Sequence, residues 1–134
     1  MILFIAVVAG SPLLNLLLKE IFQRGRPDLH RLVEIGGYSF PSGHAMNAFT
    51  VYGILTFLLW PHIFNPSGRP ILILFSAFVV LMSGISRIYL GVHYPSDIIG
   101  GYFASGFWIA ASIWFFQWYV ERQPHLASRM LKRS

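Results

Sequence analysis

Long stretches without charge constrain this chain more than any other feature. The first 18 of its 134 residues carry no charged side chain, Arg69 is the single charge between Ala45 and Ile85, and residues 98–120 carry none. A helix needs about 20 mainly apolar residues to cross the hydrocarbon core of a bilayer. The sequence therefore predicts one all-α domain over residues 1–134. It is an integral-membrane helical bundle with four transmembrane helices, at about residues 1–18, 44–60, 70–90 and 97–120.

The composition excludes a water-soluble domain. Only 11% of the residues are charged and 55% are hydrophobic, whereas an ordinary soluble domain carries roughly a quarter charged residues. Disorder is also excluded, because 12 Phe, 6 Tyr and 4 Trp are too much apolar surface to stay solvated. The chain has no cysteine, which excludes disulfides, thiolate metal sites and a cysteine nucleophile. Its net charge of +5 favours an anionic partner.

Glycine and proline separate the predicted helices. Residues 61–70 contain three prolines and one glycine, and residues 91–95 begin with glycine and end with proline, so both segments predict short turns. Residues 10–12, Gly-Ser-Pro, predict a kink in the first helix. Gly101 and Ser105 are small residues four apart on the fourth helix and predict a close helix contact. A cleaved signal peptide is the less favoured interpretation of the first segment, because that segment has no basic start.

Two predicted loops, 19–43 and 91–96, are separated by two membrane crossings and therefore emerge on the same face. The basic residues divide five against five between the faces, so the positive-inside rule alone does not orient the chain. If the basic residues on the face of the two loops bind an anion, only those on the opposite face indicate which side is cytoplasmic. This predicts a cytoplasmic C-terminal tail and loops on the outer or luminal side. The basic residues on the face of the loops are Lys19, Arg24, Arg26, Arg31 and Arg87, and those on the opposite face are Arg69, Arg122, Arg129, Lys132 and Arg133.

Three polar clusters fall on that one face. The first is KEIFQRGRP at 19–27 and the second is PSGH at 41–44. The third consists of Ser86, Arg87, His93 and Asp97. Each has a structural interpretation when taken alone. Basic residues at a helix end anchor to headgroups, a serine caps a helix, and an aspartate in a first turn complements the helix dipole. Taken together, the three clusters indicate a binding site.

Several of these residues suit a phosphate group. Arg87 lies at the inner margin of its loop, where an unpaired charge in lipid costs about 2.5–3.5 kcal/mol or more, so it needs an anion. Arg26 and Arg87 can each offer paired donors to phosphoryl oxygens. Ser42 as an N-cap leaves the amides of Gly43 and His44 free, and a helix N-terminus of this kind binds phosphate.

The histidines suit proton and phosphoryl transfer. Asp97 follows His93 by four residues, so its carboxylate can accept from one ring nitrogen and leave a lone pair on the other. His44 has no carboxylate in its own cluster and is better placed to donate a proton.

In order and spacing the motifs K-x6-RP, PSGH and SR-x5-H-x3-D resemble the three-part motif of the type-2 phosphatidic acid phosphatase superfamily. The resemblance covers about residues 15–105. It implies a metal-free phosphatase without a cofactor, which hydrolyses a lipid phosphate or isoprenoid diphosphate from the bilayer of a bacterial plasma membrane, with its site on the periplasmic side. The family pattern has six transmembrane helices, so the resemblance implies that this chain lacks the first two.

The resemblance also assigns roles. It implies that His93 is the nucleophile and forms a phosphohistidine, that Asp97 orients it, and that His44 protonates the leaving oxygen. The implied ligands of the phosphoryl oxygens are Lys19, Arg26, Ser42, the Gly43 amide and Arg87.

Two other functions stay open. A phosphotransferase would pass the phosphoryl group from His93 to an alcohol instead of water, and a non-catalytic protein would only bind anionic lipid through Arg26 and Arg87. Nucleic acid is not an expected partner, because the basic residues are split between two membrane faces. No metal is expected, because the histidines and carboxylates share no ligand geometry. The remaining expectations are solvated histidines at His30, His62 and His125, and headgroup or interfacial contacts for Arg24 and Arg31.

Overall fold

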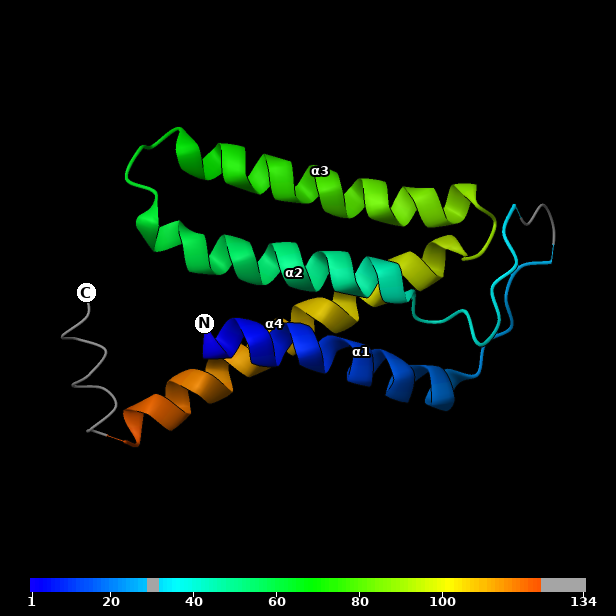
Figure 1. Cartoon of the computed structure of the whole chain (residues 1–134), viewed down its shortest axis with the longest axis horizontal. Helices are drawn as coiled ribbons and strands as arrows, with labels where there is room; N and C mark the ends of the chain where they lie inside the picture. Colours follow the sequence, from blue (N-terminus) through cyan, green and yellow to red (C-terminus); the bar gives the residue numbers. More distant parts are fainter. Residues whose placement is uncertain (29–31, 124–134) are drawn as a thin grey trace.

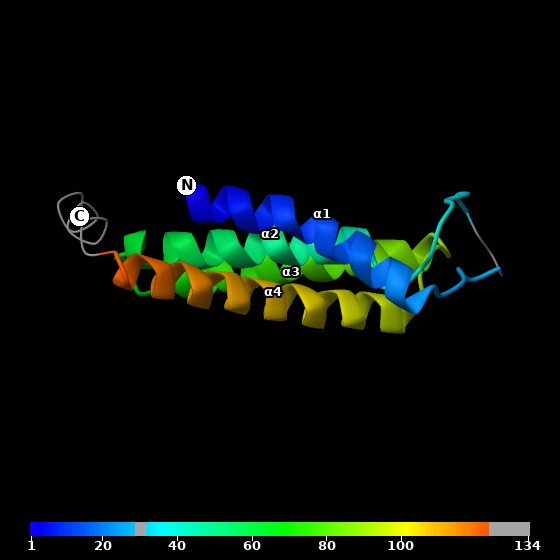
Figure 2. The same cartoon turned by 90° about the horizontal axis from the view of Figure 1, so that it is seen from below.

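The structure is a computed structural model that describes residues 1–28 and 32–123. This part of the chain contains four α-helices, one 3-10 helix and no strand, which confirms the predicted all-α class. The helices run along the longest dimension of the molecule (Figure 1, Figure 2). They are α1 (Ile2–Phe22), α2 (Gly43–Leu59), α3 (Gly68–Tyr89) and α4 (Pro95–Glu121), and the 3-10 helix η1 (Trp60–His62) follows α2.

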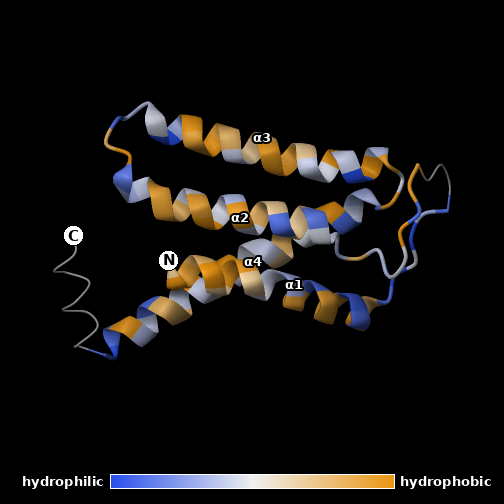
Figure 3. Cartoon of the chain, viewed as in Figure 1, coloured by the Kyte–Doolittle hydropathy of each residue, from blue (hydrophilic) through white to orange (hydrophobic). Residues whose placement is uncertain are grey.

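Three helices of the described part, α1, α3 and α4, are long and apolar enough to cross a membrane. Figure 3 shows α1 and α3 as mainly hydrophobic. Many large apolar side chains of α3 are exposed, among them Ile71, Leu74 and Phe78, as expected of a surface that faces lipid. The chain is therefore an integral membrane protein. The remaining α-helix, α2, has 17 residues and rises only about 26 Å, somewhat less than the roughly 30 Å of a bilayer core.

The short helix α2 is central, because it packs against α1, α3 and α4. Val7 of α1, Ile54 of α2 and Ile109 of α4 form the buried apolar cluster where three helices meet. Nearby, the Thr50 hydroxyl donates to Ser11 Oγ over 3.1 Å. Hydrogen bonds of this kind satisfy polar side chains between helices, where no water is at hand.

Small residues let α4 approach α2 closely. A Cβ atom on Gly101 would lie 3.2 Å from the Ser42 carbonyl oxygen. Ser105 Oγ donates to the Met46 carbonyl over 3.0 Å. The predicted close contact at Gly101 and Ser105 is confirmed, and α2 is the partner.

The α1–α4 contact depends on Trp108. Its ring covers Gly10, where any Cβ atom would collide with it. Its Nε1 donates to the Val7 carbonyl over 2.9 Å. α1 continues through Pro12, so the kink predicted at residues 10–12 does not interrupt the helix.

The predicted end of the first helix was wrong by four residues. α1 ends at Phe22 instead of Leu18, and Gln23 then closes it in a left-handed conformation with a φ of 46°. Lys19 is thus a helical residue of the last turn, where a cation is favourable for the helix dipole. The first charged residue therefore did not mark the helix end.

The starts of the later helices were also predicted slightly too late. α3 begins at Gly68 instead of residue 70, and α4 at Pro95 instead of residue 97. Proline is tolerated in a first helical turn, because the N–H it lacks would have no acceptor within the helix. The site-facing loops consequently span 23–42 and 90–94, shorter than the predicted loops.

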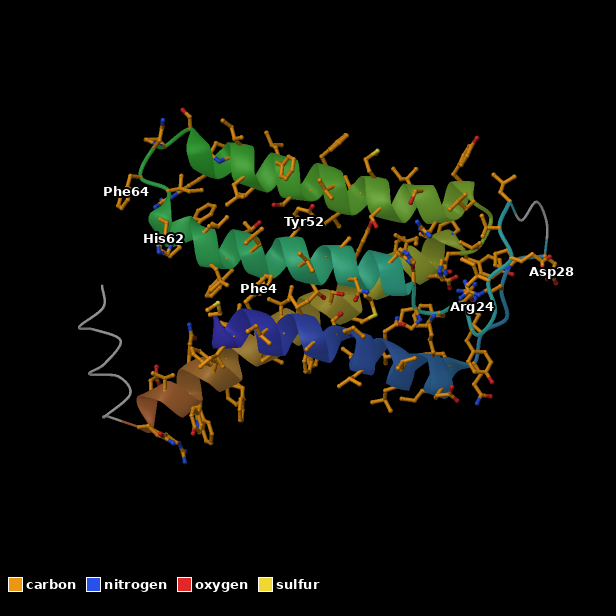
Figure 4. The ribbon with its side chains drawn as sticks, viewed as in Figure 1. Phe4, Arg24, Asp28, Tyr52, His62 and Phe64 are labelled. Carbon is orange, nitrogen blue, oxygen red and sulfur yellow. The ribbon has the colours of Figure 1, made fainter. Side chains whose placement is uncertain are left out.

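These two loops lie at the same end of the bundle, as the count of crossings predicted (Figure 1). Leu32 N donates to the Leu90 carbonyl over 3.0 Å and joins them. The α2–α3 turn lies at the other end, where Figure 4 shows His62 and Phe64. The expectations for Arg31, His30, His125 and the C-terminal tail with Arg129, Lys132 and Arg133 lie outside the described residues.

Candidate active site

A histidine–aspartate pair lies at the start of α4. His93 Nδ1 is 3.4 Å from Asp97 Oδ2, and the side chains are 4% and 0% exposed. The same carboxylate oxygen accepts from the Tyr94 amide over 2.8 Å. Pro95 starts the helix, so His93 lies just before α4 and Asp97 lies in its first turn. The two side chains, four residues apart, face each other. The pair therefore has the geometry that their spacing predicted.

The guanidinium of Arg26 approaches the other ring nitrogen of His93. Its Nη1 is 3.4 Å from His93 Nε2 and donates to the Val92 carbonyl over 3.0 Å. Its Nε donates to the carbonyls of Gly36 and Gly37 over 3.2 and 3.1 Å. Arg26 thus links the long loop to the histidine and puts positive charge beside Nε2.

The PSGH segment begins α2 beside this pair. Ser42 is fully buried and caps the helix, because its Oγ accepts from the Ala45 amide over 3.4 Å. The Ser42 amide donates to the Asp97 carbonyl over 3.1 Å, and Met46 N makes the first helical bond to the Ser42 carbonyl. The amides of Gly43 and His44 therefore have no acceptor within α2, and they point out of its N-terminus.

His44 is exposed at the start of α2, at the end of the bundle where Lys19 lies in the last turn of α1 and Arg87 in the last turn of α3. Its imidazole interacts electrostatically with Arg87, His93 and Lys19. Lys19, on the last turn of α1, interacts in turn with Arg26. The structure therefore brings all eight predicted site residues to one end of the bundle: Lys19, Arg26, Ser42, Gly43, His44, Arg87, His93 and Asp97.

Arg87 lies in the last turn of α3. Its Nε atom is buried and, among the described residues, is the one buried side-chain nitrogen or oxygen without a hydrogen-bond partner. A buried charged donor without an acceptor is costly. The unpartnered Nε of Arg87 therefore suits a ligand that supplies anionic oxygens.

Arg24 lies at a position that the sequence did not predict. It was expected at lipid headgroups or the interface, but its Nη1 donates to Asp97 Oδ1 over 3.0 Å and to Ser96 Oγ over 2.6 Å. The signal that could have found it is the spacing to Arg26. Side chains two apart in a non-helical segment are near enough to reach one site from one stretch of chain.

Asn15 was also missed as a site residue. Its Nδ2 donates to the Pro41 carbonyl over 3.0 Å and contacts Met46 Sδ at 3.1 Å. A Cβ atom on Gly43 would lie 3.1 Å from Asn15 Oδ1, so a glycine there lets the PSGH segment approach α1. The available signal was a polar residue in an apolar helix, four before Lys19 and hence on the same face.

The described residues contain no group of three His, Cys, Asp or Glu side chains that could hold a metal ion. His62 is exposed at the end of the bundle opposite the site, as expected, and its Nδ1 is 3.1 Å from the Leu58 carbonyl.

Fold and site together define a class: a helical integral membrane protein with a buried histidine–aspartate pair among cationic side chains at one end. Its three motifs stand on the elements that form this end. The PAP2 superfamily model matches residues 1–121, so the chain belongs to the PAP2 superfamily. The resemblance seen in the motifs is confirmed.

Solved and curated relatives agree with this membership. The crystal structure of a transmembrane PAP2 type phosphatidylglycerolphosphate phosphatase from Bacillus subtilis has a TM-score of 0.77 and 35% identity, over 91% of this chain and 61% of that one. Phosphatidylglycerophosphatase B of Bacillus subtilis is 39% identical over 102 residues, 75% of this chain and 50% of the relative. An undecaprenyl-diphosphatase of Sulfolobus acidocaldarius is 41% identical over 73 residues, 54% of this chain and 31% of the relative. The chain thus spans half the length of these curated relatives or less.

Proposed function

We propose that this protein is a membrane lipid phosphatase. It hydrolyses the terminal phosphate of a lipid phosphate or isoprenoid diphosphate through a phosphohistidine on His93, without a metal ion, and residues 1–134 form one transmembrane phosphatase domain. The observation that carries the proposal is the buried Nε of Arg87, which has no hydrogen-bond partner in the described part of the chain. A phosphoryl oxygen supplies the acceptor that this donor lacks.

In the first step, the lone pair on His93 Nε2 attacks phosphorus. The P–N bond forms while the P–O bond to the leaving group breaks, and His44 gives its proton to the leaving oxygen. The Nδ1 proton stays on His93, facing Asp97 at 3.4 Å, whose negative charge stabilises the cationic ring. The released group is a lipid alcohol or a shorter lipid phosphate.

In the second step, water attacks the phosphorus of the phosphohistidine. The P–N bond breaks, His44 accepts a proton from the water, and inorganic phosphate leaves, so both histidines return to their starting states. Positioning and charge stabilisation supply most of the catalysis in phosphoryl transfer. Lys19, Arg26 and Arg87 would provide the positive charge that magnesium provides in many other phosphoryl-transfer enzymes.

The relatives support a lipid as the substrate. Two of them are named phosphatidylglycerophosphatase B and undecaprenyl-diphosphatase, and each name refers to a lipid that carries phosphate. In this chain, exposed apolar side chains cover the helices next to the site, as expected of surfaces that face the acyl chains of a bilayer.

We orient the site toward the outer side of the membrane. At the opposite end of the bundle, Arg69 lies over the Trp60 ring at 5.1 Å and Arg122 over the Trp118 ring at 4.2 Å. Because the basic residues at the site end are assigned to the phosphate and to Asp97, the basic residues at this opposite end report the orientation, and basic residues favour the cytoplasmic side. The cytoplasmic tail proposed from the sequence follows the same end.

Purified protein in detergent will release phosphate from at least one lipid of a panel of phosphatidate, phosphatidylglycerophosphate and undecaprenyl diphosphate. The rate will be unchanged in EDTA and will fall with orthovanadate, which mimics five-coordinate phosphorus. Release is measured with a colorimetric phosphate assay. Loss of activity in EDTA would contradict metal independence, and full activity in vanadate would contradict the site.

Arg87→Lys will lower kcat/KM by about 10²-fold, a loss comparable to that of one transition-state donor. The variant keeps the charge but replaces a planar fork of donors with a point charge. The matched control is Arg69→Lys, because Arg69 lies at the end of the bundle away from the site and should give wild-type kinetics. Wild-type kinetics in Arg87→Lys would show that forked donation is unimportant.

A further inference from the structure

The Asp97 carboxylate has contacts on both of its oxygens. Oδ2 accepts from the Tyr94 amide over 2.8 Å and faces His93 Nδ1 at 3.4 Å, while Oδ1 accepts from Arg24 over 3.0 Å. The carboxylate is fully buried, whereas the Arg24 side chain is 39% exposed. A buried carboxylate requires partners to stay ionised. Among these three groups, Arg24 alone carries a permanent positive charge.

Arg24 is itself held against the first turn of α4. Its Nη1 also donates to Ser96 Oγ over 2.6 Å, and its guanidinium lies 4.3 Å from the centroid of the Tyr94 ring. Its backbone carbonyl accepts from the Ser39 amide over 2.8 Å. These contacts hold the guanidinium beside Asp97, so the Arg24 side chain needs little further ordering to contact the carboxylate.

Two arginines thus flank the histidine–aspartate pair from different sides. Arg26 approaches His93 Nε2 at 3.4 Å, the nitrogen that would attack phosphorus. Arg24 contacts the carboxylate that faces Nδ1, on the other side of the ring. Arg24 is therefore placed away from the phosphoryl group that Arg26 would contact.

We propose that Arg24 is a positioning residue, which keeps Asp97 ionised and in the rotamer that holds His93 with its lone pair on Nε2. This inference rests on the proposed phosphatase function. Arg24 acts on the reaction through Asp97 and His93 and does not bind the phosphoryl group. It extends the set of working residues to a position that the K-x6-RP motif leaves unspecified, two residues before Arg26.

The kinetic test uses Arg24→Gln and Arg24→Lys in the full chain, with the lipid substrate that the wild type hydrolyses. Arg24→Gln should lower kcat by about 10–100-fold, the range seen when the hydrogen-bonded partner behind a metal-ligating histidine is removed. KM and inhibition by orthovanadate should stay unchanged, because Arg24 does not contact the phosphate. Arg24→Lys should recover part of kcat, because it retains the charge without the fork. Arg122→Gln is the matched control, since Arg122 also stacks on an aromatic ring but at the far end of α4, and it should leave kcat unchanged.

A second measurement does not depend on turnover. In protein labelled with ¹⁵N-histidine, the signals of His93 are assigned by comparison with His93→Gln. Wild type should show the tautomer protonated at Nδ1, and Arg24→Gln should show a reduced population of it. If Arg24→Gln does not fold, the same measurements on Arg24→Lys decide.

The outcomes separate this inference from the proposed function. Unchanged kcat with an unchanged His93 tautomer overturns the role of Arg24 while the phosphatase stands. A raised KM at constant kcat also overturns it, because Arg24 would then bind substrate. If the wild type releases no phosphate from any lipid, the proposed phosphatase function is wrong. The tautomer measurement still tests Arg24 in that case, because an unchanged His93 tautomer in Arg24→Gln would show that Arg24 does not position the His93–Asp97 pair.

Discussion

His93→Gln will lower phosphate release from the lipid substrate by about 10⁴-fold or more, the scale of losing a nucleophile. Glutamine is polar and similar in size, but its amide has no nitrogen lone pair able to attack phosphorus. Phosphate release in detergent measures the loss, and helix content by circular dichroism checks that the bundle still forms. The second readout is the intermediate: wild type incubated briefly with ³²P-labelled substrate should carry an acid-labile, base-stable phosphoryl group that His93→Gln lacks.

The matched control for this variant is His62→Gln. His62 is exposed at the end of the bundle opposite Arg24 (Figure 4), so its loss should leave the rate unchanged. If His93→Gln retains hydrolysis, His93 is not the nucleophile. Labelling of His93→Gln as strong as that of the wild type would place the phosphoryl group on another residue.

Asp97→Asn will lower kcat on the order of 10³–10⁴-fold, the scale seen when a carboxylate that orients a catalytic histidine becomes an amide. The amide can donate to His93 Nδ1, which favours the tautomer protonated at Nε2 and removes the attacking lone pair. It also removes the negative charge that stabilises the cationic ring. Glu121→Gln, at the other end of α4, is the control and should behave as wild type.

A double variant sharpens this prediction. Because Arg24 is inferred to act through Asp97, adding Arg24→Gln to Asp97→Asn should lower kcat by less than about threefold, far from additive. A full additional loss in the double variant would mean that Arg24 and Asp97 act independently. Near wild-type kcat in Asp97→Asn alone would remove Asp97 from the mechanism.

The membrane bundle was predictable because bilayer thickness acts on local composition. Each charge-free stretch is read from the chain without knowledge of its neighbours, and the parity of crossings places both loops at one end. The helix ends were less predictable. Lys19 continues α1 because its ammonium can lie near the last carbonyls, and Pro95 starts α4 because the first turn does not need its N–H.

The candidate site also contains residues that were predictable from the sequence and residues that were not. The predicted motif residues stand at helix ends or in the loops 23–42 and 90–94, so parity alone brings them to one end of the bundle. Arg24 and Asn15 could not be assigned in this way. The contact between Arg24 and Asp97 depends on how loop 23–42 folds back, with Ser39 N on the Arg24 carbonyl, and irregular loops have no periodicity that predicts such a contact.

By itself, the sequence determined that this chain is a helical membrane protein of the PAP2 superfamily, with its polar motifs at one end. Hydrophobic length, crossing number and residue order are properties of the chain alone. The tertiary structure decided which polar groups touch: Arg24 contacts Asp97, and Asn15 contacts the Pro41 carbonyl. It also decided that the buried Nε of Arg87 has no hydrogen-bond partner. Hydrogen bonds require atoms within about 3 Å, and only the packed helices and the folded loop set those distances.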